Sequence, residues 1–220
     1  MAISVIPRFQ PDSPATYKQL IEQYRQIPAS TLGHLTTRGY LSGIRSQLTD
    51  NHMAGSVVTV KVFPPDAGAI REALLLSQAG DVLVIECAHK HEEAYGDSVN
   101  PIDYACWGEL RNLAAQIKAL AGVIVAGPVT DIQALRKHHL PVFATGVSAL
   151  TTCTMPESTG EVNGSIQVAG VAIQPGDIAV GDDDGVFILS PQHAEELLPL
   201  ALDKECSDEC KRQELLSKLF

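Results

Sequence analysis

The chain has 220 residues, of which 45% are hydrophobic and 19% charged, so it carries enough apolar side chains for a folded core. Sixteen basic against 26 acidic residues give a net charge of −10, which argues against binding to nucleic acid or to a membrane surface, because both need a basic patch. No apolar run approaches the ~20 residues of a membrane helix. The first residues lack the features of a signal peptide, and the five cysteines are scattered. We therefore expect a cytoplasmic protein with reduced thiols.

In the first half of the chain, helical and strand patterns alternate. Apolar spacing predicts a helix over residues 14–27, and Ser30-Thr31 offers an N-cap for a short helix ending near Gly39. A β-branched run predicts a strand over 53–63, broken by two prolines. A helix over 67–78 follows, and the apolar run 81–86 is typical of a buried strand.

The second half continues the alternation and then becomes rich in strands. We expect helices over 105–120 and 131–137 and strands over 123–125 and 141–144. Short β-segments fill 162–189, and Pro191 opens a C-terminal helical region that runs to Phe220 with an interruption at Pro199. This order predicts one layered, mixed α/β domain over residues 1–220.

Common catalytic and metal-binding motifs are absent from the sequence: there is no GxGxxG, Walker loop, HExxH, CxxC or GxSxG. His89-Lys90-His91 could form a metal pair, but with no third ligand nearby, solvated histidines are the favoured interpretation. The run Asp182-Asp183-Asp184-Gly185 lacks the spacing of an EF-hand and predicts a turn between strands.

Two loops in the centre of the chain carry the best candidates for chemistry. Gly108-Glu109-Leu110 opens a helix, and the free backbone N–H groups at a helix N-terminus can hold a carboxylate. The loop ending in Thr130-Asp131 follows a buried strand and opens the next helix. From spacing alone, Asp131 is either a plain N-cap or a metal-binding or catalytic residue.

Six segments, taken in order and spacing, resemble the RraA-like family. This family includes the class II, metal-dependent 4-hydroxy-4-methyl-2-oxoglutarate/4-carboxy-4-hydroxy-2-oxoadipate aldolases. The resemblance covers most of the chain, and the matching segments are residues 53–60, 80–85, 108–110, 121–131, 141–146 and 175–186.

The resemblance implies a single-domain, layered α/β/β/α fold of the swivelling β/β/α type, with a C-terminal helical tail from about residue 191. It implies assembly as a homotrimer or homohexamer with the site between subunits. In the aldolases a divalent metal and a Gly-Glu/Asp-Leu loop hold pyruvate. By this resemblance the amides of Gly108, Glu109, Leu110 and Arg111 would bind the carboxylate, Glu109 would lie near Mg²⁺ or Mn²⁺, and Asp131 would bind the metal.

The sequence departs from the family's Gly-x-x-Arg-Asp motif at one position, where Thr130 replaces the arginine that contacts substrate oxygens. Losing a preorganised donor of this kind typically costs about 2.7–4 kcal/mol, or roughly 10²–10³ in rate. Either another cation substitutes, or the substrate differs, or the protein does not run this reaction. Arg111 is the nearest candidate replacement; the alternative is an arginine on the helix surface.

A second departure is His34, which stands where many family members carry aspartate. If its segment lines the cleft, His34 could act as an acid or base or bind substrate, because imidazole titrates near neutrality. The alternative is a buried, hydrogen-bonded helix histidine.

Two hypotheses from different classes follow. The first is a metal-dependent lyase that acts on a small 2-oxo acid through an enolate, by retro-aldol cleavage releasing pyruvate or by decarboxylation of oxaloacetate; oxygen ligands favour Mg²⁺ or Mn²⁺ over zinc. The second is a non-catalytic protein that inhibits a ribonuclease by protein contact, as some family members do. The loss of the motif arginine at Thr130 fits the second, whereas the presence of Glu109 and Asp131 fits the first.

Overall fold

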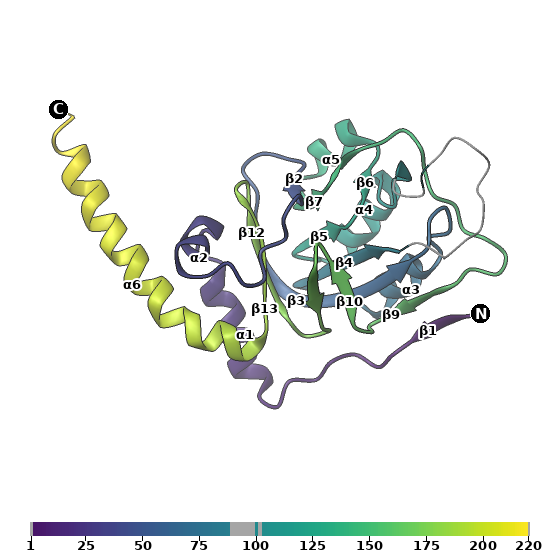
Figure 1. The fold of residues 1–220 in the computed structure, drawn as a ribbon, viewed down its shortest axis with the longest axis horizontal. Helices are drawn as coiled ribbons and strands as arrows, with labels where there is room; N and C mark the ends of the chain where they lie inside the picture. Colours follow the sequence, from purple (N-terminus) through teal and green to yellow (C-terminus); the bar gives the residue numbers. More distant parts are fainter. Residues whose placement is uncertain (1, 89–99, 101–102, 220) are drawn as a thin grey trace.

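A parallel four-stranded core organises the fold (Figure 1). The computed structural model describes residues 2–88, 100 and 103–219, so the predicted histidine pair at residues 89 and 91 lies outside the described part. The core strands follow one another in the sheet in chain order: β3 (His52–Val62), β4 (Asp81–Cys87), β5 (Gly122–Val125) and β7 (Val142–Ala144). Their carboxyl ends meet at one edge, where α/β proteins commonly bind ligands.

Strand β3 is long enough to join two parts of the sheet. Its second half pairs with β4, and its first half pairs antiparallel with β12 (Ile178–Asp182), which forms a hairpin with β13 (Gly185–Leu189). The sheet is completed by β9 (Gly160–Val162), β1 (Ile3–Val5) and β2 (Arg45–Ser46). Two small pairs stand apart: β10 (Ile166–Val168) with β11 (Val171–Ile173), and β6 (Pro128–Val129) with β8 (Gly146–Val147).

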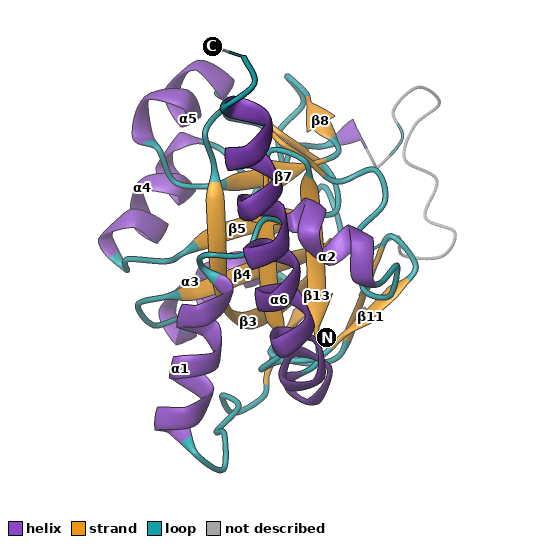
Figure 2. Ribbon diagram, turned by 90° about the vertical axis from the view of Figure 1, so that its left-hand side faces the viewer, coloured by secondary structure: helices purple, strands orange, loops and turns teal. Residues whose placement is uncertain are grey.

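Helices cover the sheet in two groups (Figure 2). The helices α3 (Ala69–Leu76), α4 (Glu109–Ile117) and α5 (Ile132–His138) share one buried cluster with β3, β4 and β5. Alternate residues of these strands point to the other face, where β10 and β11 cover them. A third cluster joins β12 and β13 to α1 (Pro14–Tyr24), α2 (Ala29–Leu35) and α6 (Pro191–Leu216). The predicted layered α/β class is confirmed.

Two element predictions were wrong. The helix expected from residue 105 begins only at Glu109, because Ala105 and Trp107 form β-bridges to Thr151 and Val129. The C-terminal helix begins at Pro191 as expected but is not interrupted at Pro199. A proline removes one hydrogen bond from a helix, and burial of Ala194, Leu197 and Ala201 on either side holds this helix together. Its C-terminal half extends away from the body (Figure 1).

The acidic run at Asp182–Asp184 is the predicted turn between β12 and β13. The Asp182 carboxylate accepts a hydrogen bond from the Ala29 amide at 2.8 Å, and the Asp183 carboxylate accepts from the amides of Asp50 and Asn51. These carboxylates therefore bind backbone groups of neighbouring segments. Across the described helices, no stretch is both long and apolar enough to cross a membrane.

Candidate functional site

The two predicted loops lie side by side at the carboxyl edge of the parallel sheet. After β5 the chain forms the short strand β6, and Trp107 pairs with Val129 in a parallel bridge. The Thr130 amide donates a hydrogen bond to the Trp107 carbonyl at 2.8 Å. The residues that follow, Gly108-Glu109 and Asp131, are thereby brought together as α4 and α5 begin.

Asp131 stands at the start of α5 but does not cap that helix. Its backbone is left-handed (φ 53°, ψ 38°), a conformation that aspartate tolerates better than most residues, and its side chain makes no capping bond in α5. Its Oδ2 atom instead accepts a hydrogen bond from the Glu109 amide at 3.1 Å. The plain N-cap interpretation is therefore wrong: the carboxylate faces the positive end of α4.

Gly108 is required by the packing of the two loops. A Cβ atom at this position would lie 2.6 Å from Asp131 Oδ2 and 2.7 Å from Thr130 Cγ2. Its carbonyl accepts from the Asn112 amide, and the buried Asn112 side chain accepts from the Trp107 indole N–H at 3.1 Å. Leu110 and Arg111 follow in the first turn of α4, where helix geometry leaves amides without intrahelical partners.

His138 joins the site although the sequence interpretation did not select it. Its Nε2 atom lies 3.3 Å from Glu109 Oε1, and the Gln116 side chain donates a hydrogen bond to its carbonyl. His138 is two turns of helix beyond Asp131, so the two residues share one side of α5. That periodicity was the available signal, but the predicted helix ended one residue too early.

The Arg111 side chain packs beneath the loop, and it is not the free surface arginine of the alternative interpretation. Its guanidinium donates to the carbonyls of Cys106 and Ala67 and to the Thr152 hydroxyl. Burial lowers the pKa of this guanidinium. These three acceptors hold the guanidinium beneath the loop, and the replacement of the motif arginine by Arg111 stays a prediction.

His34 lies elsewhere in the chain's fold. It is exposed on α2, which packs against α6, β12 and β13, so the expectation of a buried histidine is wrong. On α6, Asp208 is close enough to His34 for their charges to interact, and Glu205 accepts a hydrogen bond from Thr31. Within one chain, His34 is therefore separate from the Glu109–Asp131 junction.

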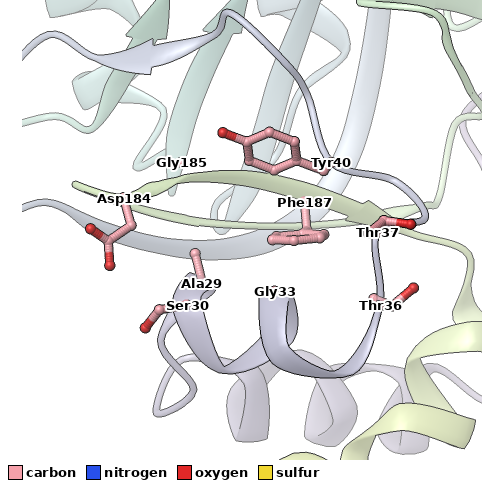
Figure 3. A pocket seen from close by; sticks show the side chains of 9 residues that line it. All are labelled: Ala29, Ser30, Gly33, Thr36, Thr37, Tyr40, Asp184, Gly185 and Phe187. Carbon is pink, nitrogen blue, oxygen red and sulfur yellow. The ribbon is translucent and has the colours of Figure 1, made fainter.

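One cavity lies beside α2, the helix that carries His34, and another lies beside α4, the helix that carries Glu109. One, of about 250 Å³, lies between α2 and the β12–β13 hairpin, with Phe187 and Tyr40 as its aromatic walls (Figure 3). It contains none of the predicted site residues. The second, of about 450 Å³, is a groove between α3 and α4 that reaches Leu110 and Arg111. This groove therefore reaches two of the predicted substrate-binding residues, whereas Glu109, Thr130 and Asp131 do not line it.

The donor set suits a hard divalent cation. Glu109 and Asp131 supply carboxylates, and Mg²⁺ is usually held by one or two carboxylates together with water and substrate oxygens. Over the described residues, no group of three His, Cys, Asp or Glu side chains gathers, so a cage made only of protein ligands is not formed there. Asp131 and Glu109 thus fit Mg²⁺ or Mn²⁺ better than zinc.

The fold and this junction define an α/β protein in which the Asp131 carboxylate meets the Glu109 amide at the carboxyl edge of a parallel sheet. The RraA-like family model, described as Aldolase/RraA, matches residues 29–188, and the chain belongs to this family. A Halalkalibacterium halodurans protein named "Putative 4-hydroxy-4-methyl-2-oxoglutarate aldolase" is 30% identical over 88% of this chain and 87% of its own length. The Thermus thermophilus 4-hydroxy-4-methyl-2-oxoglutarate aldolase is 32% identical over 62% of this chain and 74% of its own.

Solved structures agree with this assignment. Streptomyces coelicolor RraAS2, described as an unusual member of the RNase ES inhibitor RraA protein family, is 27% identical with a TM-score of 0.73. The match covers 94% of this chain and 99% of that one. The predicted family and its RraA-like fold are confirmed.

Proposed function

We propose that this protein is a lyase that uses Mg²⁺ or Mn²⁺ to cleave a small 2-oxo acid beside its carbonyl group, releasing pyruvate. The observation that carries the proposal is the contact of the Asp131 carboxylate with the Glu109 amide. It sets the Asp131 carboxylate against the N-terminus of α4, on the residue that carries the second predicted carboxylate, and a helix N-terminus with a nearby carboxylate suits a metal and a carboxylate ligand. Aldolase relatives support the same reaction class.

Each residue of the junction has a part in this proposal. The backbone amides of Leu110 and Arg111, in the first turn of α4, bind the substrate carboxylate. Asp131 and Glu109 hold the ion, and His138 orients the Glu109 side chain through its 3.3 Å contact. When bound, the ion supplies positive charge opposite the oxygen on which negative charge develops.

Thr130 makes this site weaker toward the developing charge than one with the motif arginine. Its hydroxyl provides one neutral donor where a guanidinium provides several charged ones. We expect turnover about 10²–10³-fold below that of an arginine-containing site on the same substrate. A substrate that carries its own positive group, or whose leaving carbon is more acidic, would need less stabilisation of the developing negative charge by residue 130.

Self-association completes the proposal. The apolar side chains of Leu110, Ile117 and Leu75 are 81%, 87% and 57% exposed along the α3–α4 groove. Large apolar groups gathered on one surface mark an interaction site, and this one adjoins the candidate site. We propose a homotrimer or homohexamer in which a neighbouring copy covers this groove. Light scattering after size exclusion would give the mass, and Ile117→Asp is expected to reduce it.

The experiment is release of pyruvate from oxaloacetate and from 4-hydroxy-4-methyl-2-oxoglutarate, each with Mg²⁺, with Mn²⁺ and with EDTA. Turnover that needs the metal and is lost in Asp131→Ala would support the lyase. Turnover that persists in Asp131→Ala would contradict the role given to Asp131. No turnover in any mixture would remove both substrates from the proposal.

A second function is favoured by Thr130 itself. A site without the motif arginine suits a protein that acts by contact with a ribonuclease, and the structural neighbour from Streptomyces coelicolor belongs to a family described as inhibitors of such an enzyme. In this case the protein would lower ribonuclease activity in a mixture of the two. That effect would be unchanged by EDTA and by Asp131→Ala, and this separates it from the lyase.

A further inference from the structure

A pair of thiols lies directly beneath the candidate site. Cys87 ends β4 and Cys106 precedes Trp107-Gly108, and their Sγ atoms are 3.3 Å apart. Cys106 is fully buried, whereas Cys87 is partly exposed. At this separation the two sulfur atoms are in direct contact.

Several contacts hold the pair in place. The Cys106 amide donates to the Pro128 carbonyl, and its own carbonyl accepts from Arg111. The Cys87 side chain packs against Gly127: a Cβ atom added to this glycine would lie 3.0 Å from Cys87 Sγ. The sulfur pair therefore packs against both loops of the candidate site, the one that carries Glu109 and the one that carries Asp131.

We propose that Cys87 and Cys106 form an oxidation site, a dithiol that a peroxide converts to a reversible intrachain disulfide. The thiol of Cys87, the less buried of the two residues, reacts first. Its sulfur takes one oxygen from hydrogen peroxide, giving a sulfenic acid and one water. The Cys106 sulfur then attacks the Cys87 sulfur, and the hydroxyl leaves as a second water. Two thiols lose two hydrogen atoms, and one peroxide is reduced to two waters.

Closing this bond changes the site. The sulfur atoms must approach from 3.3 Å to about 2.05 Å, so the segments that carry them shift toward each other. Gly108 stands two residues after Cys106 and lies so close to Asp131 and Thr130 that an added Cβ atom would be 2.6 Å and 2.7 Å from their side chains, so a shift of Cys106 is passed on to them. Oxidation should therefore disturb the Glu109–Asp131 contact. This inference does not depend on which reaction the site performs.

The electrostatic surroundings set the conditions for reaction. The hydrogen bond with Cys106, burial, and the nearby charge of Glu86 raise the pKa of the Cys87 thiol, while Arg111 opposes them. A thiol with a raised pKa is mostly protonated at neutral pH and reacts slowly, because the thiolate is the nucleophile. The pair should stay reduced under mild conditions and be oxidised by sustained exposure to peroxide.

The experiment isolates the pair and uses a built-in reporter. In a Cys153→Ser/Cys206→Ser/Cys210→Ser variant only Cys87 and Cys106 remain, and Trp107, the single tryptophan of the chain, is fully buried beside Cys106. The variant is treated with hydrogen peroxide, denatured, alkylated and weighed. Trypsin separates the two cysteines into peptides 72–90 and 91–111. Adding Cys87→Ser to the variant gives the matched control, and Cys106→Ser gives a second.

We expect the treated variant to lose the mass of two hydrogens, to resist alkylation, and to yield the two peptides joined by a bond that dithiothreitol breaks. Trp107 fluorescence should change and recover with the same reagent, and neither effect should occur in the Cys87→Ser control. Full alkylation after peroxide, or a mass gain of oxygen without joined peptides, would overturn the disulfide. Joined peptides with unchanged fluorescence would overturn its effect on the site.

Discussion

The Asp131 Oδ2 atom accepts a hydrogen bond from the Glu109 amide at 3.1 Å, so the carboxylate that begins α5 closes the N-terminus of α4. This contact is not local in the sequence, because 21 residues lie between Glu109 and Asp131. Strand β5 returns the chain to the same edge of the sheet and so brings the two residues together. A carboxylate gains from the positive end of a helix. The contact also keeps its second oxygen available for a ligand.

The variant Asp131→Asn tests the negative charge of this side chain apart from its shape. Asp131→Asn keeps an oxygen that can accept from the Glu109 amide but removes the negative charge. We expect metal-dependent turnover to fall by at least about 10²-fold, because the ion's contribution is several kcal/mol. Pyruvate release measures the loss, and circular dichroism checks the fold. Turnover in Asp131→Asn equal to that of the wild type would show that the charge is not used.

Adding one methyl group at Gly108 should damage the junction more than the fold. The new Cβ would lie 2.6 Å from Asp131 Oδ2, so we expect Gly108→Ala to lose metal-dependent activity and about 1–3 kcal/mol of stability. Gly33→Ala is the control, since its Cβ would meet only Phe187, at 3.9 Å. Urea unfolding and pyruvate release measure the two effects. Equal behaviour of the two variants would contradict the tight packing at Gly108.

Thr130 can be tested by restoring the family residue. Thr130→Arg should raise turnover of 4-hydroxy-4-methyl-2-oxoglutarate by about 10²–10³-fold, because a guanidinium stabilises developing charge that a hydroxyl does not. Thr130→Gln, a longer neutral donor, should give little of this gain. A Thr130→Arg variant no faster than Thr130→Gln would mean that the natural substrate needs no cation here.

Arg111 should matter for stability. Arg111→Ala leaves the Cys106 carbonyl without this donor, and an unsatisfied buried group costs about 1–3 kcal/mol. The Ala67 carbonyl keeps its hydrogen bond from the Ile70 amide. Arg136→Ala, at an exposed position of α5, is the control and should change the unfolding free energy little. Urea midpoints at neutral pH give both values. An Arg111→Ala variant as stable as the wild type would show that the buried contacts are weak.

Asp66 gives the chain one source of acid sensitivity. Burial raises the pKa of this carboxyl, but hydrogen bonds from the Thr159 and Gly68 amides and the Ser158 hydroxyl outweigh burial, and the net pKa is lowered. The pKa of an aspartate in the unfolded chain is about 3.9. Because the pKa of Asp66 is lower in the folded state, its ionised carboxylate stabilises the protein at pH values above that of the unfolded chain. This stability is lost as the pH falls from there through the folded-state pKa.

The matching variant is Asp66→Asn. It should unfold more easily than the wild type at pH 7, and its stability should fall less steeply as the pH drops below about 4, because the titrating group is gone. Urea unfolding at several pH values measures both slopes. Parallel curves for the two proteins would assign the acid sensitivity to other groups.

Much of the fold could be predicted because the strands and the amphipathic helices carry clear periods. The apolar run at 81–86 and the β-branched run at 53–63 became β4 and β3 almost unchanged. Short segments such as β6 and the extended stretch before Gly108 were missed, since two or three residues carry no period of their own. Their conformation is set by pairing with distant segments.

The candidate site was predictable in its residues but not in its contacts. Glu109 and Asp131 were selected from the sequence, and the structure brings them together. His138 and the position of the Arg111 side chain depend on how α4 packs on α5 and on the loop beneath, which no local pattern encodes. His34 was selected because histidine is a common acid or base, but within one chain it lies on α2, away from Glu109 and Asp131.

The most direct test of a metal site at Asp131 is binding of oxalate, a stable mimic of a planar 2-oxo acid, measured by calorimetry with and without Mg²⁺. We expect binding to the wild type only when Mg²⁺ is present, and loss of that binding in Asp131→Asn. Oxalate binding that is equally strong without Mg²⁺, or unchanged in Asp131→Asn, would contradict a metal site built on Asp131.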